Sequence, residues 1–146
     1  MTYARLVNEM LNASMEVQDI KTRFEGDIYQ MNIIDDLEWP VFVISPTEPQ
    51  VESENSMMYS LTLYYADREM NSNDHKGVPD TLGIHSRGIS ALSYIIQKTR
   101  ERLYNEIFDV QFPISYTLWN DTEILNDKCN GVFCTVEISA PKENVC

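Results

Sequence analysis

Residues 56–66 read SMMYSLTLYYA, a run in which large apolar side chains alternate with other residues. The odd-numbered positions from Met57 to Tyr65 are all large and apolar, whereas the even-numbered positions include Ser60 and Thr62. This period of two is typical of a β-strand that turns one face toward a core. At about 3.3 Å per residue, the predicted strand is roughly 30 Å long.

The residues that precede this strand predict another strand and a first helix. Residues 41–44 form an uninterrupted run of β-branched and aromatic side chains between two prolines, which is typical of a strand covered on both faces. Over residues 3–13 apolar side chains recur every three or four positions, and Thr2 can cap this helix. Residues 16–38 follow neither period, so we expect an extended arm or a hairpin there.

A longer helix is predicted over residues 81–104. Its apolar positions alternate at intervals of three and four for three heptads, which gives a stripe wide enough to pack on a sheet. The basic residues Lys98, Arg100 and Arg102 suit the negative end of the helix dipole.

Two further alternating segments follow this helix. Residues 110–118 predict a strand in which Pro113 marks an edge position or a distortion, and residues 132–139 predict another strand. A polar loop, residues 119–130, lies between them. The order of elements predicts a single α+β domain over residues 1–146. We expect a largely antiparallel sheet with the N-terminal helix and the long helix packed on one face.

The core is predicted from the positions at which these patterns turn large apolar side chains inward. The predicted core residues are Leu82, Ile89, Leu92, Ile96 and Leu103 on the long helix, and Leu61, Leu63, Phe112, Ile114 and Val136 on the strands.

The composition is strongly acidic. The chain has 146 residues with 23 Asp and Glu against 11 Lys and Arg, so its formal net charge is −12. Proteins that grip nucleic acid or an anionic membrane need a cationic surface, which this composition does not favour. No segment is apolar enough to span a membrane, and the N-terminus lacks the pattern of a secretory signal. We therefore expect a protein that is not exported and has no membrane partner.

No motif for catalysis stands out, and we predict that the protein is not an enzyme. Cys129, Cys134 and Cys146 form an odd set without a C-x-x-C pair, which fits a reducing compartment. His85 lies on the apolar stripe of the long helix, where a packed or hydrogen-bonded histidine is expected. A catalytic pair of His85 with Cys134 stays open, because spatial adjacency is not visible in a sequence.

The sequence also lacks the spacing of known cofactor and metal sites. Gly88 has none of the surrounding residues of a phosphate-binding loop and is expected to let another backbone approach closely. Asp121, Glu123 and Asp127 do not have the spacing of a calcium loop. We predict no cofactor and no metal.

Several segments in a fixed order carry a resemblance to a known family. They are WPVFVISP at 39–46, the strand at 59–65 ending at Asp67, the long helix with Ser86, Trp119-Asn120 followed by Asp127, GVFCTVEI at 131–138, and the tail at 141–146. Their order and spacing resemble the small ring proteins of tailed bacteriophages, in the tail-terminator or neck (head–tail joining) family. The resemblance is to those of phages that infect Bacteroidetes (crAss-like phages). It covers about four-fifths of the chain, and residues 16–38 depart from it.

This resemblance implies a tail-terminator-like fold and a structural role in the neck or tail of the virion. The protein would be made in the cytoplasm of the host bacterium and would form a hexameric or dodecameric ring of identical copies. Adjacent portal, neck or tail rings would be its other partners, and DNA would pass through the ring without specific binding. The interface candidates lie in two polar loops: Glu48, Glu52, Glu54, Trp119, Asp121, Glu123 and Asp127.

Two alternatives to a ring protein stay open at this point. The first is an acidic binding module made by a phage, such as a DNA mimic or an inhibitor of a host protein, because the net charge of −12 suits that role as well. The second is an enzyme whose site is assembled from scattered residues.

Overall fold

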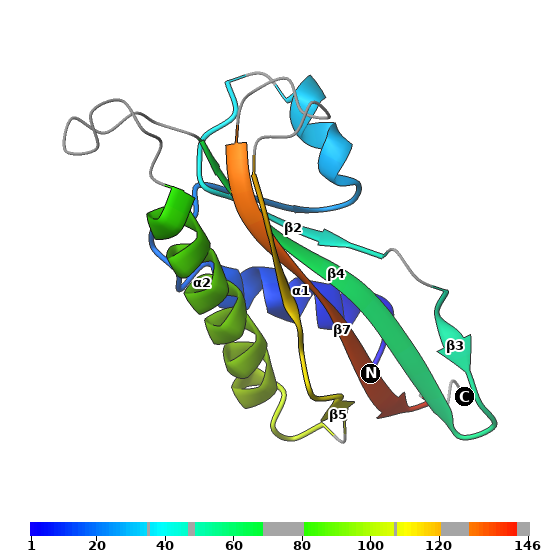
Figure 1. Ribbon diagram of the computed structural model, residues 1–146. Coiled ribbons are helices and arrows are strands. Elements are labelled where there is room, and N and C mark those ends of the chain that lie inside the picture. Colours follow the sequence, from blue (N-terminus) through cyan, green and yellow to red (C-terminus); the bar gives the residue numbers. More distant parts are fainter. Residues whose placement is uncertain (35, 47–48, 69–80, 107, 121–128, 143–146) are drawn as a thin grey trace, which may run out of the picture.

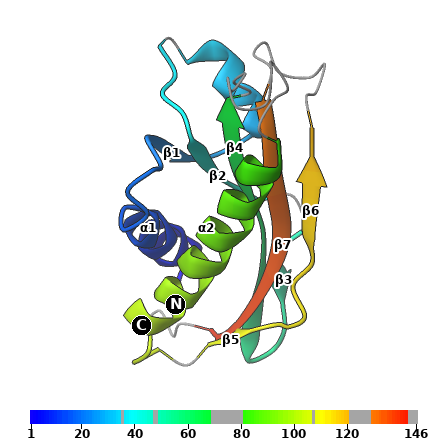
Figure 2. The same cartoon turned by 60° about the vertical axis from the view of Figure 1, so that its left-hand side comes forward.

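A mostly antiparallel sheet forms one layer of the protein, and two α-helices lie on one face of it (Figures 1 and 2). The computed structural model describes residues 1–34, 36–46, 49–68, 81–106, 108–120 and 129–142. The helices are α1 (Tyr3–Ser14) and α2 (Thr81–Arg102). The predicted α+β class, with a largely antiparallel sheet, an N-terminal helix and a longer helix, is therefore confirmed.

The sheet has seven strands within the described residues, and its central path runs in the order β1-β2-β4-β7-β5. Strand β3 also pairs with β4, and β6 also pairs with β7; only β1 and β2 run parallel. The strands are β1 (Thr22–Glu25), β2 (Val41–Ser45), β3 (Val51–Glu52), β4 (Ser56–Arg68), β5 (Asp109–Val110), β6 (Tyr116–Trp119) and β7 (Cys129–Pro141).

Strands β4 and β7 form the centre of this sheet. They pair over 13 residues each, from Ser56 opposite Pro141 to Arg68 opposite Cys129. The alternation in the sequence sets their faces, since Leu61 and Leu63 of β4 and Val136 of β7 are all fully buried. The long predicted strand is thus confirmed, as are these three core positions.

One side chain completes the hydrogen bonding of β4. Strand β2 pairs with β4 as far as Thr62, and β3 pairs with it as far as Met58, which leaves Ser60 between them. The side-chain amide of Gln50 fills this gap: Nε2 donates to the carbonyl oxygen of Ser60 at 3.0 Å, and the Ser60 N–H donates to Oε1 at 2.8 Å. Gln50 therefore takes the place of a peptide group beside β4.

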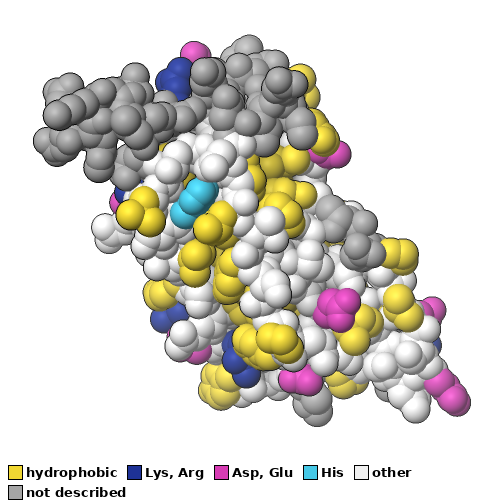
Figure 3. All heavy atoms as spheres, in the orientation of Figure 1, with side chains coloured by type: hydrophobic (Ala, Val, Ile, Leu, Met, Phe, Trp, Pro, Cys, Tyr) yellow, Lys and Arg dark blue, Asp and Glu magenta, His cyan; other side chains and the backbone are white. Residues whose placement is uncertain are grey.

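The phase of α2 differs from the predicted stripe. Leu82 and Ile89 are 82% and 37% exposed, so their assignment to the core is wrong. The helix meets the sheet through Gly88, where a Cβ atom would lie 2.6 Å from Cγ2 of Val132 and 2.9 Å from Cδ1 of Tyr65. Because successive residues are about 100° apart around a helix, burying Gly88 turns Ile89 outward. Hydrophobic side chains are consequently visible along α2 (Figure 3).

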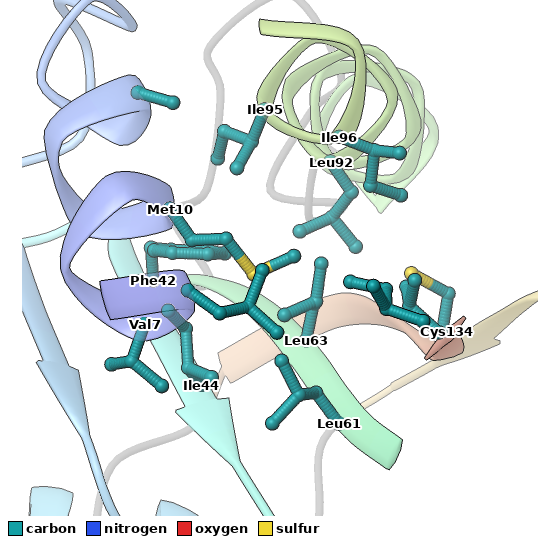
Figure 4. Packing of buried hydrophobic residues seen from close by; sticks show 14 of the residues in the cluster. Val7, Met10, Phe42, Ile44, Leu61, Leu63, Leu92, Ile95, Ile96 and Cys134 are labelled. Atoms are coloured by element: carbon teal, nitrogen blue, oxygen red, sulfur yellow. The ribbon is translucent and has the colours of Figure 1, made fainter. Parts of the chain in front are cut away.

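The main core lies between the helices and the sheet (Figure 4). Leu92, Ile96 and Leu103 are buried as predicted, and Met10 of α1 packs in the same cluster. The predicted cap of α1 is also confirmed, since the Thr2 side-chain oxygen accepts a hydrogen bond from the backbone N–H of Arg5.

The predicted strand at residues 110–118 is two short strands, β5 and β6. Val110 lies opposite Ile138, and Tyr116 lies opposite Cys134. The chain therefore advances six residues from Val110 to Tyr116 while β7 advances only four. The extra residues include Pro113, which has no N–H for a ladder hydrogen bond. The chain between these strands leaves the ladder.

This bulge changes the burial of the two predicted core residues within it. Phe112 is 60% exposed, so its assignment to the core is wrong. Ile114 is partly buried and packs against the main core.

Residues 16–38 hold β1 and a 3₁₀ helix, η1 (Ile28–Ile33), which Asp27 caps. Strand β1 pairs in parallel with β2. Met31 of η1 belongs to a second, smaller cluster of buried residues with Val41 and Val43, which alternate with the β2 residues of the main core. Residues 41–44 are buried on both faces of the sheet for this reason, as the sequence predicts.

Replacing Leu92 with alanine is expected to lower the free energy of unfolding by about 2–5 kcal/mol, because the change leaves a cavity in a fully buried site. Leu82→Ala, in the same helix but exposed, is the matched control and should change it by less than about 0.5 kcal/mol. Urea unfolding followed by circular dichroism measures both. Equal effects would contradict the observed phase of α2.

Candidate interaction surface

Cys134 and His85 have separate structural roles. Cys134 is 1% exposed, and burial raises the pKa of its thiol to about 12, so it stays protonated at neutral pH and is a poor nucleophile. Nε2 of His85 lies 3.1 Å from the carbonyl oxygen of Trp119, which ties α2 to β6. The prediction of a packed or hydrogen-bonded histidine is confirmed, and the geometry gives no support to a catalytic pair.

A search of the described part of the chain finds no group of three or more His, Cys, Asp or Glu side chains that could hold a metal ion. In the same residues, no helix is long and apolar enough to cross a membrane. Cys129 is buried in the second cluster. Five residues named from the sequence lie outside the described residues: Cys146 and the interface candidates Glu48, Asp121, Glu123 and Asp127.

The remaining interface candidates are spread over the fold. Glu52 lies on β3, and its carboxylate is 2.7 Å from Nζ of Lys142. Glu54 is exposed in the turn between β3 and β4. Trp119 ends β6, and its partner in the ladder is Gly131, near the opposite end of β7 from Pro141, which lies beside the start of β4 at Ser56. These residues do not form one patch.

Trp119 packs at the edge of the second cluster. A Cβ atom on Gly131 would lie 2.6 Å from Cζ2 of the indole ring and 2.1 Å from the carbonyl oxygen of Tyr65. The glycine therefore makes the room that the ring occupies. This placement matches a residue that caps the core, although Nε1 of the indole is buried and has no hydrogen-bond partner among the described residues.

An open cleft of about 400 Å³ lies between α2 and the segment that follows α1. Glu16 and Asp19 line one wall, and Arg87 with hydroxyl side chains lines the other. Nη2 of Arg87 is 3.6 Å from the carboxylate of Asp67. Burial raises the pKa of Asp67 above its usual value, and Arg87 opposes this shift. The described wall residues thus combine carboxylates, hydroxyls and one guanidinium, groups that can bind a polar ligand.

Some of the exposed hydrophobic side chains lie along the line where α2 meets β6 and the segment before it (Figure 3). Leu118 is 49% exposed and lies opposite Val132, the residue that touches Gly88 of α2. This contact places Leu118 beside α2. We define the α2–β6 seam as Leu82, Ile89, Phe112 and Leu118.

The seam is bordered by a cation. The guanidinium of Arg100 lies over the ring of Phe112, with its carbon 5.4 Å from the ring centroid.

Grouped apolar side chains at a surface mark sites of protein–protein contact more often than single ones do. The seam is therefore the strongest candidate for a functional surface. Three of its members, Leu82, Ile89 and Phe112, are residues that the periodicity of the sequence assigns to the core.

Comparison with known proteins adds no family. No protein-family model matches the chain, and no curated protein is significantly similar to it.

Asp67→Asn is expected to increase stability at pH 7. Because the pKa of Asp67 is raised above 3.8 in the folded protein, folding favours the protonated carboxyl. The favourable contribution is complete below the pKa of the unfolded chain, and it is lost as pH rises through the higher pKa of the folded protein. The uncharged variant Asp67→Asn keeps this favourable contribution at pH 7.

Urea unfolding of both proteins across a pH series measures this difference, which should be absent below about pH 3 and appear as pH rises. Glu54→Gln, at an exposed position, is the control. Lower stability of the Asp67 variant at pH 7 would mean that the contact with Arg87 outweighs burial.

Proposed function

We propose that this protein is a structural virion protein of a tailed phage, which assembles as a homo-oligomeric ring in the neck or tail. The observation that carries the proposal is the α2–β6 seam, an apolar strip beside an edge strand of the sheet. Burial of this strip against another protein releases water from apolar surface, which is the main driving force of association. The resemblance of the sequence to phage ring proteins supplies the architecture of the assembly.

The two edges of the sheet support assembly through the sheet. Within the described residues, β1 has a neighbouring strand only in β2, and β6 has one only in β7. Edge strands present backbone groups that a second chain can pair with. A chain with two such edges can add a copy at each of them.

In this proposal the ring joins adjacent portal, neck or tail rings and leaves a channel for DNA. The excess of 12 negative charges suits such a channel, because a carboxylate-lined bore does not hold a polyanion in place. The protein would be made in the cytoplasm of the host bacterium and act in the virion, without chemistry of its own.

Light scattering coupled to size-exclusion chromatography tests the assembly. The expected result is a closed oligomer of six or twelve copies, and mass spectrometry of purified virions should find the protein in many copies. A monomer that is absent from virions would contradict the ring. It would favour the alternative of an acidic module that binds a host protein.

The assembled protein is expected not to bind duplex DNA at about 150 mM salt. Duplex binding that weakens steeply with added salt involves about 6–10 contacts between a protein and DNA phosphates. The chain has only 11 Lys and Arg residues, of which Arg5, Arg87, Lys98, Arg102 and Lys142 already pair with carboxylates.

Titration of the ring, not of the monomer, with labelled duplex measures this. Binding below about 1 µM that weakens steeply with added salt would contradict the proposed role of the charge.

A further inference from the structure

We propose that neighbouring copies pack head to tail, with the α2–β6 seam of one copy against the β1–η1 segment of the next. This inference rests on the proposed function, because it names the surfaces through which a ring would close. Three independent observations carry it: a second apolar patch, the positions of β1 and β6 in the sheet, and the distribution of charge.

The second apolar patch lies on and just after η1. Tyr29, Ile33 and Ile34 are 50%, 78% and 37% exposed, and we define them as the η1 patch. Their neighbour Met31 points the other way, into the second core cluster. The 3₁₀ helix is thus anchored by one side and presents apolar side chains on the other.

The strand that precedes the η1 patch and the strand that carries Leu118 lie at opposite ends of the sheet order. Strand β1, which leads directly into η1, is the first strand of that order, whereas β6 lies beyond β7 on the far side (Figure 2). A contact with a two-fold axis uses the same patch on both partners. Two different patches on different elements suit a head-to-tail contact, and head-to-tail contacts close into rings when the rotation between copies allows it.

The charges of the two surfaces are complementary. Of the four basic residues of α2, Arg87, Lys98 and Arg102 pair with carboxylates of their own copy, and Arg100 takes part in none of the ion pairs found within the described residues. Residues 16–38 carry seven acidic residues and two basic ones. A contact between the two surfaces brings Arg100 of one copy to an acidic segment of the next, which favours one orientation of the pair.

Charged side chains on both surfaces stay outside the ion pairs of the fold. Arg100 is exposed beside the seam, where its guanidinium lies over the ring of Phe112, and it belongs to none of the ion pairs among the described residues. Asp36 and Glu38 are exposed just after the η1 patch and take part in none of the ion pairs found within the described residues. In the proposed contact, Arg100 of one copy faces Asp36 and Glu38 of the next copy, so that all three charged side chains gain a partner.

A second copy is therefore the occupant that fits the seam. It offers an apolar patch, the carboxylates of Asp36 and Glu38 and an outer strand of the sheet, all within residues 22–38. An unrelated partner would leave the η1 patch without a function.

The test uses three acidic substitutions at exposed hydrophobic residues. Ile89→Glu disables the seam, Ile33→Glu disables the η1 patch, and Val51→Glu is the matched control on β3, where the side chain is 53% exposed but belongs to neither surface. Thermal unfolding of each variant confirms that the fold is intact, because all three positions are on the surface. Analytical ultracentrifugation then measures assembly.

We expect Ile89→Glu and Ile33→Glu each to raise the subunit concentration needed for assembly by about tenfold or more, and Val51→Glu to leave it unchanged. The decisive sample is the mixture of the two defective variants. Each retains the surface that the other has lost, so at about 100 µM they should form a 1:1 dimer that grows no further.

The outcomes separate this inference from the proposed function. If the wild-type protein is monomeric, the proposed function fails and the packing mode with it. If the wild type assembles but both variants do so equally well, or if the mixture stays monomeric, head-to-tail packing through these surfaces is overturned while the ring stands. A loss of assembly in Ile89→Glu alone would indicate a two-fold contact through the seam and would also overturn the inference.

Discussion

The close contact of α2 with the sheet at Gly88 is the constraint on which the rest of the structure depends. Only a residue without a side chain fits between the helix backbone and the side chains of Val132 and Tyr65. This contact fixes both the distance and the rotation of α2. It therefore decides which apolar residues of the helix enter the core and which stay at the surface. The α2–β6 seam is a direct consequence of the same contact.

Much of the fold could be predicted from the sequence because strands have a strict period. A period of two leaves no choice of face once one residue is buried, so Leu61, Leu63 and Val136 were assigned correctly. The helix was harder, because apolar residues occupy more of its circumference than the sheet can cover. Leu82 and Ile89 fit a heptad pattern as well as the buried residues do, and only the tertiary contact at Gly88 separates them. Phe112 was missed for another reason, since the bulge around Pro113 breaks the alternation.

The candidate surface was less predictable than the fold. The carboxylates of the polar loops predict an interface there, whereas the exposed apolar side chains that form the candidate surface lie on or beside helices and strands. One signal for the seam was present in the sequence. The long helix has apolar residues at two overlapping sets of positions, and an excess of this kind points to a second buried face supplied by another molecule. The η1 patch had no such signal, because residues 16–38 show no period at all.

The amide of Gln50 has a consequence for the solubility of the folded chain. Sheet proteins avoid uncontrolled growth into fibrils by denying incoming chains a row of unpaired peptide groups. Between β2 and β3, the backbone of Ser60 would offer such a vacancy in one of the two central strands, and a side chain of the same molecule occupies it. Gln50 thus acts as a gatekeeper in this gap and restricts growth of the sheet to its two outer edges. In the proposed ring, copies add at the outer strands of the sheet, and the amide of Gln50 keeps them from adding at this inner gap.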